Sequence, residues 1–315
     1  VILVTGAGGS IGSELCQQIH RLKPKLLILL EQNEYNLFKI SSQLKDNILP
    51  SLTDIKDFSK MELILKKFKP DYIFHTAALK HITFVETDPI EALHTNFLAT
   101  VKLCQLCKIL KIKKMIFIST DKAVNPTNIM GASKRLCEKY IQQIASKEKD
   151  TIFTIVRFGN VLGSTGSVVP VFEKQISEGG PVKITHPKIR RFFMTIREAV
   201  ELVLISSQLK ISENGKIFIL EMGDSIYIKD LAKRMILLSG ADEKNIKIQF
   251  TGLRKGEKLN EELFFNSEKI DKTEINGILS TTSKLFCPKN TDLNKLIQEI
   301  TKKRHESSLK LFEKM

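Results

Sequence analysis

The chain has 315 residues, of which 42% are hydrophobic, so it can bury a full core as one large domain or two closely packed ones. It carries 49 Lys and Arg against 35 Asp and Glu, a formal net charge of +14 that suits an anionic partner. The lysines are scattered along the chain, and no aromatic-interleaved basic motif or zinc-finger spacing occurs, so nucleic-acid binding is disfavoured.

The five cysteines predict neither a disulfide framework nor a metal site. Cys104 and Cys107 are separated by two residues, but they lie in an apolar helical run that is typical of a core. The apolar runs, such as residues 26–30, have the length of strands, so neither a signal peptide nor a membrane span is predicted. Because the first residue is Val within a predicted strand, we expect the chain to be a fragment of a longer protein.

A glycine-rich turn, Gly6-Ala-Gly-Gly-Ser-Ile-Gly12, separates the first predicted strand from a helical stretch. Gly6 would make the tight turn, Gly9 would let the backbone approach a pyrophosphate, and Gly12 would let the helix pack closely. The start of that helix would attract phosphate. This context predicts a dinucleotide site at Gly6, Gly8, Gly9, Ser10, Ile11 and Gly12.

Glu31 directly follows the second predicted strand, near the spacing at which an acidic residue binds the ribose of a dinucleotide. A carboxylate there accepts hydrogen bonds from the ribose hydroxyls and repels a 2′-phosphate. No Arg occurs between Arg21 and Arg135 to hold such a phosphate. The sequence therefore predicts NAD rather than NADP.

Further cofactor contacts are expected where the next two predicted strands end. Asp54 and Ile55 follow the third strand and are expected against the adenine. Ala77 and Ala78 follow the fourth strand, and their small side chains would let the cofactor lie against its end.

Three polar residues near the fourth strand are also candidates. Lys80 and His81 could reach a sugar or a phosphate, although His81 could equally be a hydrogen-bonded loop histidine. Asn96 lies within a predicted helix, residues 89–108, and a mid-helix Asn often bridges backbone groups to a neighbouring strand end. We count Lys80 and Asn96 among the expected cofactor contacts.

The central stretch, residues 116–134, predicts a buried strand, a polar loop and a helix. The strand leads into three reactive side chains, Thr120, Asp121 and Lys122. They would stand at the carboxyl edge of a parallel sheet, where open α/β sheets bind their ligands. Met130 and Lys134 are four residues apart, so they share a helix face toward the same crevice. The alternative is an ordinary solvated loop.

The alternation of predicted strands and helices up to Phe158 indicates an α/β fold with a doubly wound, Rossmann-type parallel sheet. Beyond Phe158 this alternation of strands and helices changes, which predicts a smaller C-terminal α/β substrate lobe. The predicted organisation is a dinucleotide-binding domain at 1–165 with 191–222 returning to it, a substrate lobe at 166–190 and 223–290, and a C-terminal helix at 291–315.

Arg157, Arg191 and Arg254 all stand at predicted loop edges on the same side of the sheet. A planar guanidinium there would suit a diphosphate. Each of them alone could equally be a solvated surface residue.

Six segments together resemble one family. They are the glycine-rich opening, Ala77–His81, Ser119–Ala123, Met130–Lys134, Arg157–Asn160 and Gly252–Lys258. The family is that of the UDP-N-acetylglucosamine 4,6-dehydratases of bacterial surface-glycan synthesis, in the extended short-chain dehydrogenase/reductase superfamily. The resemblance covers nearly the whole chain. It is greatest to a long subgroup with an N-terminal membrane-spanning region, which implies a cytoplasmic catalytic domain, a parent protein anchored in the bacterial inner membrane, and a homo-oligomer.

The resemblance implies an internal redox cycle on UDP-N-acetylglucosamine, with hydride passing from C4 to NAD and back to C6 after loss of water. The product is a UDP-4-keto-6-deoxy-N-acetylhexosamine. Lys122, if neutral, would be the base at C5, Asp121 the acid for the C6 hydroxyl, and Thr120 the group that orients the C4 oxygen. Lys134 would hold the nicotinamide ribose. The substrate would be bound by Lys80, His81, Asn160, Arg191, Arg254 and Glu257.

One departure from the superfamily concerns the pair Tyr-x-x-x-Lys, because Met130 stands where the Tyr is expected. The match at Tyr35–Lys39 lies at the adenosine end and is not a catalytic pair. Met cannot exchange protons, so either the chain is a non-catalytic NAD-sensing module or another group takes the proton. The retained triplet and the same Met in the long subgroup favour the enzyme. A nucleotide-sugar 4-epimerase, which needs no Asp–Lys pair, is the alternative.

Overall fold

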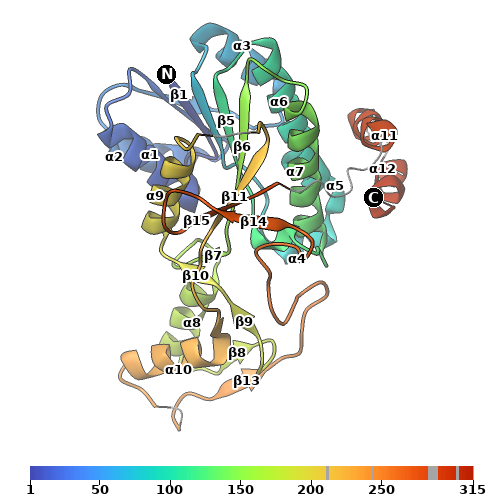
Figure 1. The fold of residues 1–315 in the computed structure, drawn as a ribbon. Coiled ribbons are helices and arrows are strands. Elements are labelled where there is room, and N and C mark those ends of the chain that lie inside the picture. The colour runs from blue at the N-terminus through green and yellow to red at the C-terminus, as the bar shows by residue number, and fades with distance from the viewer. Residues whose placement is uncertain (211–212, 243, 283–289, 303–304, 315) are drawn as a thin grey trace.

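The computed structural model describes residues 1–210, 213–242, 244–282, 290–302 and 305–314. Within these residues a nine-stranded sheet forms the centre, in the order β14-β15-β11-β6-β5-β4-β1-β2-β3 (Figure 1). All neighbouring strands from β3 to β11 are parallel, whereas β15 runs antiparallel to β11, and β14 antiparallel to β15. The predicted doubly wound parallel sheet is confirmed.

The strands of this sheet are short and mostly buried on both faces. β2 has five buried residues in a row, which explains why its sequence is continuously apolar rather than alternating. The strands are β1 Ile2–Thr5, β2 Leu27–Glu31, β3 Ile48–Leu52, β4 Tyr72–His75, β5 Lys114–Ile118, β6 Ile152–Arg157, β11 Lys216–Leu220, β14 Lys269–Lys272 and β15 Ile278–Thr282.

Helices cover both faces of the sheet (Figure 1). On one face a core joins the strands to α1 Ser10–Arg21, α2 Glu34–Gln43 and α9 Ile196–Ser206. On the other face a second core includes α3 Phe58–Phe68, α6 Ala99–Ile109 and α7 Ile129–Ala145. Before α6 the chain forms α4 Ile82–Thr87, α5 Pro89–Ala92 and the π-helical segment η1 Leu93–Leu98. Together α5, η1 and α6 cover the helix predicted at residues 89–108.

The smaller lobe has its own apolar core, built around Phe172 and Ile236. Its elements are α8 Val168–Ser177, β8 Val182–Ile184, β9 Arg190–Arg191, β12 Ile226–Tyr227, α10 Ile228–Leu238 and β13 Ile248–Phe250. β8 pairs with β13 and β9 with β12, while β7 Asn160–Val161 pairs with β10 Phe193–Met194 near the junction with the large sheet (Figure 1).

Two C-terminal features differ from the prediction. The hairpin β14–β15 lies in the segment assigned to the substrate lobe, yet it extends the large sheet, because β15 pairs with the edge of β11. The expected single C-terminal helix is described as two, α11 Asn290–Thr301 and α12 His305–Glu313, and the second packs against α5. In the described part of the chain, no helix has the length and apolarity needed to span a bilayer.

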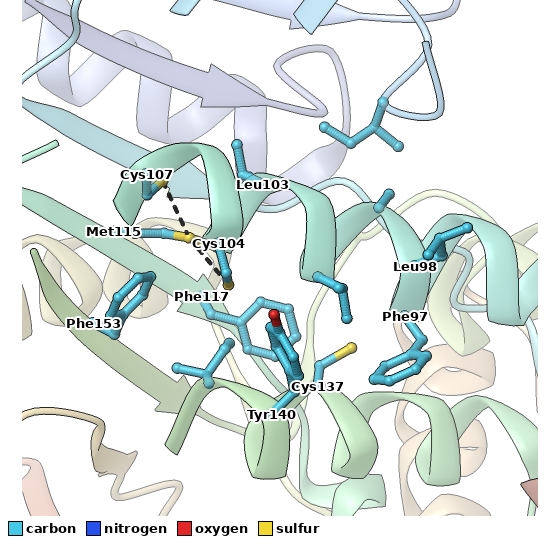
Figure 2. Packing of buried hydrophobic residues seen from close by; sticks show 14 of the residues in the cluster. Phe97, Leu98, Leu103, Cys104, Cys107, Met115, Phe117, Cys137, Tyr140 and Phe153 are labelled. Carbon is cyan, nitrogen blue, oxygen red and sulfur yellow. Dashed lines mark hydrogen bonds between the residues drawn. The ribbon is translucent and has the colours of Figure 1, made fainter. Parts of the chain in front are cut away.

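The cysteines of α6 belong to the core, as the apolar run predicted. Figure 2 shows Cys104 and Cys107 on either side of Met115, with each Sγ 3.8 Å from its Sδ. Both side chains are completely buried, and burial raises the pKa of each thiol. They are therefore packing residues without the thiolate character that metal binding or redox chemistry requires.

Candidate functional site

A cavity of about 740 Å³ lies between the carboxyl ends of the large sheet and the smaller lobe. Its walls come from the turn after β1, the loops after β2, β4, β5 and β6, and residues of β8, β9 and α10. This is where an open parallel sheet is expected to bind a ligand. Among the described residues, no group of His, Cys, Asp and Glu has an arrangement that could hold a metal ion.

The glycine-rich turn forms one end of this cavity, and all six of its predicted contact residues line it. Gly6 has a φ of +65°, and a Cβ on Gly12 would lie 2.0 Å from the carbonyl oxygen of Gly6. α1 begins directly after Gly9, which supplies no side-chain cap to the first-turn N–H groups. Uncapped N–H groups and the positive end of the helix dipole, beside a backbone with no side chain in the way, fit a pyrophosphate.

Glu31 lines the cavity beside this turn and is only 7% exposed. Its Oε2 accepts a hydrogen bond from the N–H of Gly8 at 3.0 Å, and its Oε1 accepts one from the N–H of Asn33, also at 3.0 Å. These bonds fix the carboxylate, and each oxygen keeps acceptor capacity for a further donor.

Ile55, Ala77 and Ala78 also line the cavity, but Asp54 and Asn96 do not. Asp54 closes a turn by accepting from the N–H of Lys56 at 2.9 Å. Asn96, in η1, bridges backbone as a mid-helix Asn can: it accepts from the N–H of Leu79 at 2.8 Å and donates to the carbonyl of Leu79 at 3.0 Å. Asn96 therefore supports the cavity loop after β4, and the direct cofactor contacts of Asp54 and Asn96 stay predictions.

The residues after β5, Thr120, Asp121 and Lys122, form a hydrogen-bonded triplet at the cavity wall. The Nζ of Lys122 donates to Asp121 Oδ1 at 2.9 Å and to Asn160 Oδ1 at 3.1 Å, and Thr120 Oγ1 donates to Asp121 Oδ1 at 2.8 Å. Thr120, Lys122 and Asn160 line the cavity, whereas Asp121 is completely buried behind them. The backbone of the triplet is held because the N–H of Asp121 donates to the carbonyl of Phe158 after β6.

α7 brings Met130 and Lys134 to the same cavity, on one helix face as predicted. The helix can approach the triplet because Gly131 has no side chain: a Cβ there would lie 2.1 Å from the carbonyl oxygen of Lys122. Met130 is 4% exposed and packs with Val85 and Ala92 in a small apolar cluster.

Lys134 is buried, and its Nζ donates to the carbonyl of Ile118 at 2.9 Å while lying 4.4 Å from the centre of the Phe117 ring. Burial lowers the pKa of Lys134 to about 8. The neighbouring His75 is neutral, because burial and the charge of Lys134 lower its pKa to about 3. Lys134 is thus a buried basic group bonded to the end of β5, the strand that leads into the triplet.

The six predicted substrate-binding residues all line the cavity: Lys80, His81, Asn160, Arg191, Arg254 and Glu257. Burial lowers the pKa of Lys80, and burial together with the charge of Lys80 lowers that of His81. Arg191 is already paired, with its Nη2 3.5 Å from Glu257 Oε1. Lining residues that the sequence did not single out include Ser164, Thr165, Gly166, Lys183 and Thr185.

Arg157 is not at the cavity, so its predicted role in binding a diphosphate is wrong. Its side chain is completely buried, with Nη2 2.9 Å from Glu138 Oε2 and Nη1 3.0 Å from Glu268 Oε2. Although burial alone would raise the pKa of Glu138, Arg157 and Arg135 lower it to about 2. The guanidinium ties α7 and the loop before β14 to the sheet.

One acidic residue near the triplet was missed. Glu261 is 7% exposed, and its Oε1 lies 4.0 Å from Arg191 Nε. Burial raises its pKa, and so does the nearby Asp121, while Lys122, Arg191 and Lys258 oppose the rise. The sequence places it in a basic-acidic loop, and no local pattern distinguishes it from its less buried neighbour Glu262.

Three curated relatives are similar over most of the chain. The capsular polysaccharide biosynthesis protein CapD of Staphylococcus aureus is 45% identical over 273 residues, 85% of this chain and 45% of that protein. An inverting UDP-N-acetylglucosamine 4,6-dehydratase of Campylobacter jejuni is 34% identical over 82% of this chain and 76% of that protein. A UDP-glucose 4-epimerase of Rickettsia bellii is 34% identical over 88% of this chain and 80% of that protein. The chain thus spans about half the length of CapD.

Solved structures show the same fold. Pen from Bacillus thuringiensis matches with a TM-score of 0.82 at 34% identity, over 90% of this chain and 88% of that one. DesIV, a dTDP-glucose 4,6-dehydratase of Streptomyces venezuelae with NAD bound, matches with a TM-score of 0.74 at 20% identity. The match covers 84% of this chain and 88% of that one. The family model described as polysaccharide biosynthesis protein matches residues 2–283. The chain therefore belongs to this polysaccharide biosynthesis protein family.

Proposed function

We propose that the protein is an NAD-dependent UDP-N-acetylglucosamine 4,6-dehydratase that acts in bacterial surface-glycan or glycoprotein sugar synthesis. The observation that carries this proposal is the bonded triplet Thr120–Asp121–Lys122 on the wall of the cavity that begins at the glycine-rich turn. A base and an acid joined by one hydrogen bond suit the removal of a proton and a hydroxyl from adjacent carbons. The similarity to the Campylobacter jejuni dehydratase supports it.

The glycine-rich turn and Glu31 would hold NAD, with the pyrophosphate at the start of α1 and the adenosine ribose on the carboxylate. Lys134 would hold the nicotinamide ribose and supply positive potential near the C4 oxygen of the sugar. Bound NAD⁺ would supply the acceptor for the C4 hydride and the donor of that hydride to C6. No external reductant would then be consumed.

The chain's own groups would move the protons. Once C4 is a ketone, the proton on C5 is acidic, and Lys122 would remove it. This step needs Lys122 as the neutral amine and Asp121 as the carboxylic acid, and a hydrogen bond of 2.9 Å joins the two groups. Asp121 would then protonate the departing C6 hydroxyl. Thr120, bonded to Asp121, lies on a route by which the C4 hydroxyl proton could reach that carboxylate.

A nucleotide-sugar 4-epimerase is the second candidate, because the Rickettsia bellii epimerase is as similar as the dehydratase. Incubation of the purified protein with UDP-N-acetylglucosamine and no added cofactor separates the two. The dehydratase gives a product lighter by one water in the mass spectrum, whereas an epimerase gives a product of unchanged mass. An NAD-sensing module gives no product.

Replacement of Glu31 by Ala is expected to narrow a strong preference for NAD over NADP. The wild-type carboxylate can accept from the ribose hydroxyls and repels a 2′-phosphate, and Ala does neither. Isothermal titration of both cofactors measures the preference, and Glu34→Ala, on an exposed residue of α2, is the control. Equal affinities of the wild type for NAD and NADP would contradict the role given to Glu31.

A further inference from the structure

Two buried carboxylate oxygens near the triplet lack a hydrogen-bond partner among the described residues. They are Asp121 Oδ2 and Glu261 Oε2. Leaving a buried charged acceptor without a donor is costly. Protonation of one of the two carboxylates lowers this cost, because a neutral carboxylic acid is less costly to bury than a charged group.

The backbone is held by hydrogen bonds on both sides of Glu261. The carbonyl of Leu259 accepts from the N–H of Arg190 at 2.9 Å, and the carbonyl of Leu263 accepts from Arg157 Nη1 at 3.0 Å. The chain is thus fixed on both sides of Glu261. Glu262, by contrast, turns outward, where its Oε2 accepts from Asn125 Nδ2 and its side chain is 44% exposed.

The charges around Glu261 are not enough to make it an ordinary carboxylate. The cations that face it are Lys122, Arg191 and Lys258, and the acid that faces it is Asp121. Lys122 is hydrogen-bonded to Asp121, Arg191 is shared with Glu257, and Lys258 donates to the carbonyl of Val124 at 2.8 Å. Each of these basic side chains thus has another partner, and none of them donates a hydrogen bond to Glu261 Oε2.

We propose that Glu261 is a positioning residue that stays protonated and so keeps Asp121 able to accept the C4 hydroxyl proton. This inference rests on the proposed dehydratase function. Two like charges in one buried site cannot both ionise easily. If Glu261 were ionised, Asp121 would be driven to hold a proton at rest and could not take another.

The protons balance over one turnover. Before C4 is oxidised, the scheme needs Lys122 as the neutral amine, Asp121 as a carboxylate and Glu261 as an acid. The C4 hydroxyl proton passes through Thr120 to Asp121, which then gives it to the C6 hydroxyl as the C6–O bond breaks and water leaves. Lys122 takes the C5 proton in that elimination and returns it to C5 when C6 receives the hydride. Glu261 keeps its proton throughout.

The test compares the pH dependence of turnover in the wild type, Glu261→Gln and the control Glu262→Gln. A raised pKa means that Glu261 stays protonated above its ordinary range and that wild-type activity falls as pH rises through the raised value. The amide of Gln mimics the neutral acid, so Glu261→Gln should lose less than the roughly 10²-fold of a proton-transfer group and should lose this alkaline fall. Glu262→Gln should keep the wild-type profile.

Infrared spectroscopy gives a reading independent of activity. The carbonyl stretch of a protonated carboxylic acid should be present in the wild type at neutral pH and absent in Glu261→Gln. In Asp121→Asn, which removes the neighbouring charge, this band should disappear at lower pH than in the wild type. An alkaline fall that persists in Glu261→Gln, or a band that this variant retains, overturns the proposal. A wild type that shows the band but removes no water disproves the dehydratase function instead.

Discussion

Replacement of Lys122 by Ala is expected to abolish the loss of water from UDP-N-acetylglucosamine, by at least the roughly 10²–10⁴-fold of a positioned proton-transfer group. The side chain lines the cavity and is bonded to Asp121 and Asn160, and no other described lysine is bonded to Asp121. Exchange of the C5 proton with deuterated solvent should also stop, because the loss of water and the C5 exchange need the same base. NAD binding should survive, since the glycine-rich turn lies at another end of the cavity.

Asp121→Asn removes the proposed acid but keeps the proposed base, so it distinguishes the two roles. It should block the loss of water but leave C5 exchange detectable, because Lys122 remains. Lys122→Arg is the matched variant: it keeps a long basic side chain but cannot supply a neutral base, since Arg stays protonated. Normal C5 exchange in Lys122→Ala would show that another group is the base.

Thr120→Val should lower turnover by about 10²–10⁴-fold with little change in shape. The hydroxyl is the donor to Asp121 Oδ1 and faces the cavity, whereas Val has no proton to pass on. Met130→Leu, a swap of similar volume, should lower turnover far less, because Met130 contributes packing in its apolar cluster and no proton. Steady-state turnover rates of the two variants test whether Thr120 transfers a proton while Met130 contributes only packing. An inactive Met130→Leu beside an active Thr120→Val would give Met130 a direct role.

The position of the triplet could be predicted because it follows from a local rule. A buried apolar strand in an alternating α/β chain ends at the carboxyl edge of a parallel sheet, and the residues after it meet the glycine-rich turn there. Thr120 and Lys122 line the cavity accordingly. The face shared by Met130 and Lys134 follows from helix periodicity in the same way.

The buried charge network could not be predicted, because its members are far apart in the sequence. Arg157 looks like a loop-edge arginine until Glu138 on α7 and Glu268 before β14 enclose it. Glu261 likewise differs from Glu262 only through the tertiary contacts that bury it. The hairpin β14–β15 was missed because β14 is short and mixes charges with one apolar residue, so its pairing with the sheet leaves little trace in the pattern.

The central claim, internal transfer of hydride from C4 to C6, is tested most directly with UDP-N-acetylglucosamine that carries deuterium at C4. The wild-type protein, given no external reductant, is expected to form the 4-keto-6-deoxy product with that deuterium at C6, as read by mass spectrometry and NMR. A product of unchanged mass with the deuterium still at C4 would indicate an epimerase. A dehydrated product that has lost the deuterium to solvent would contradict the internal redox cycle.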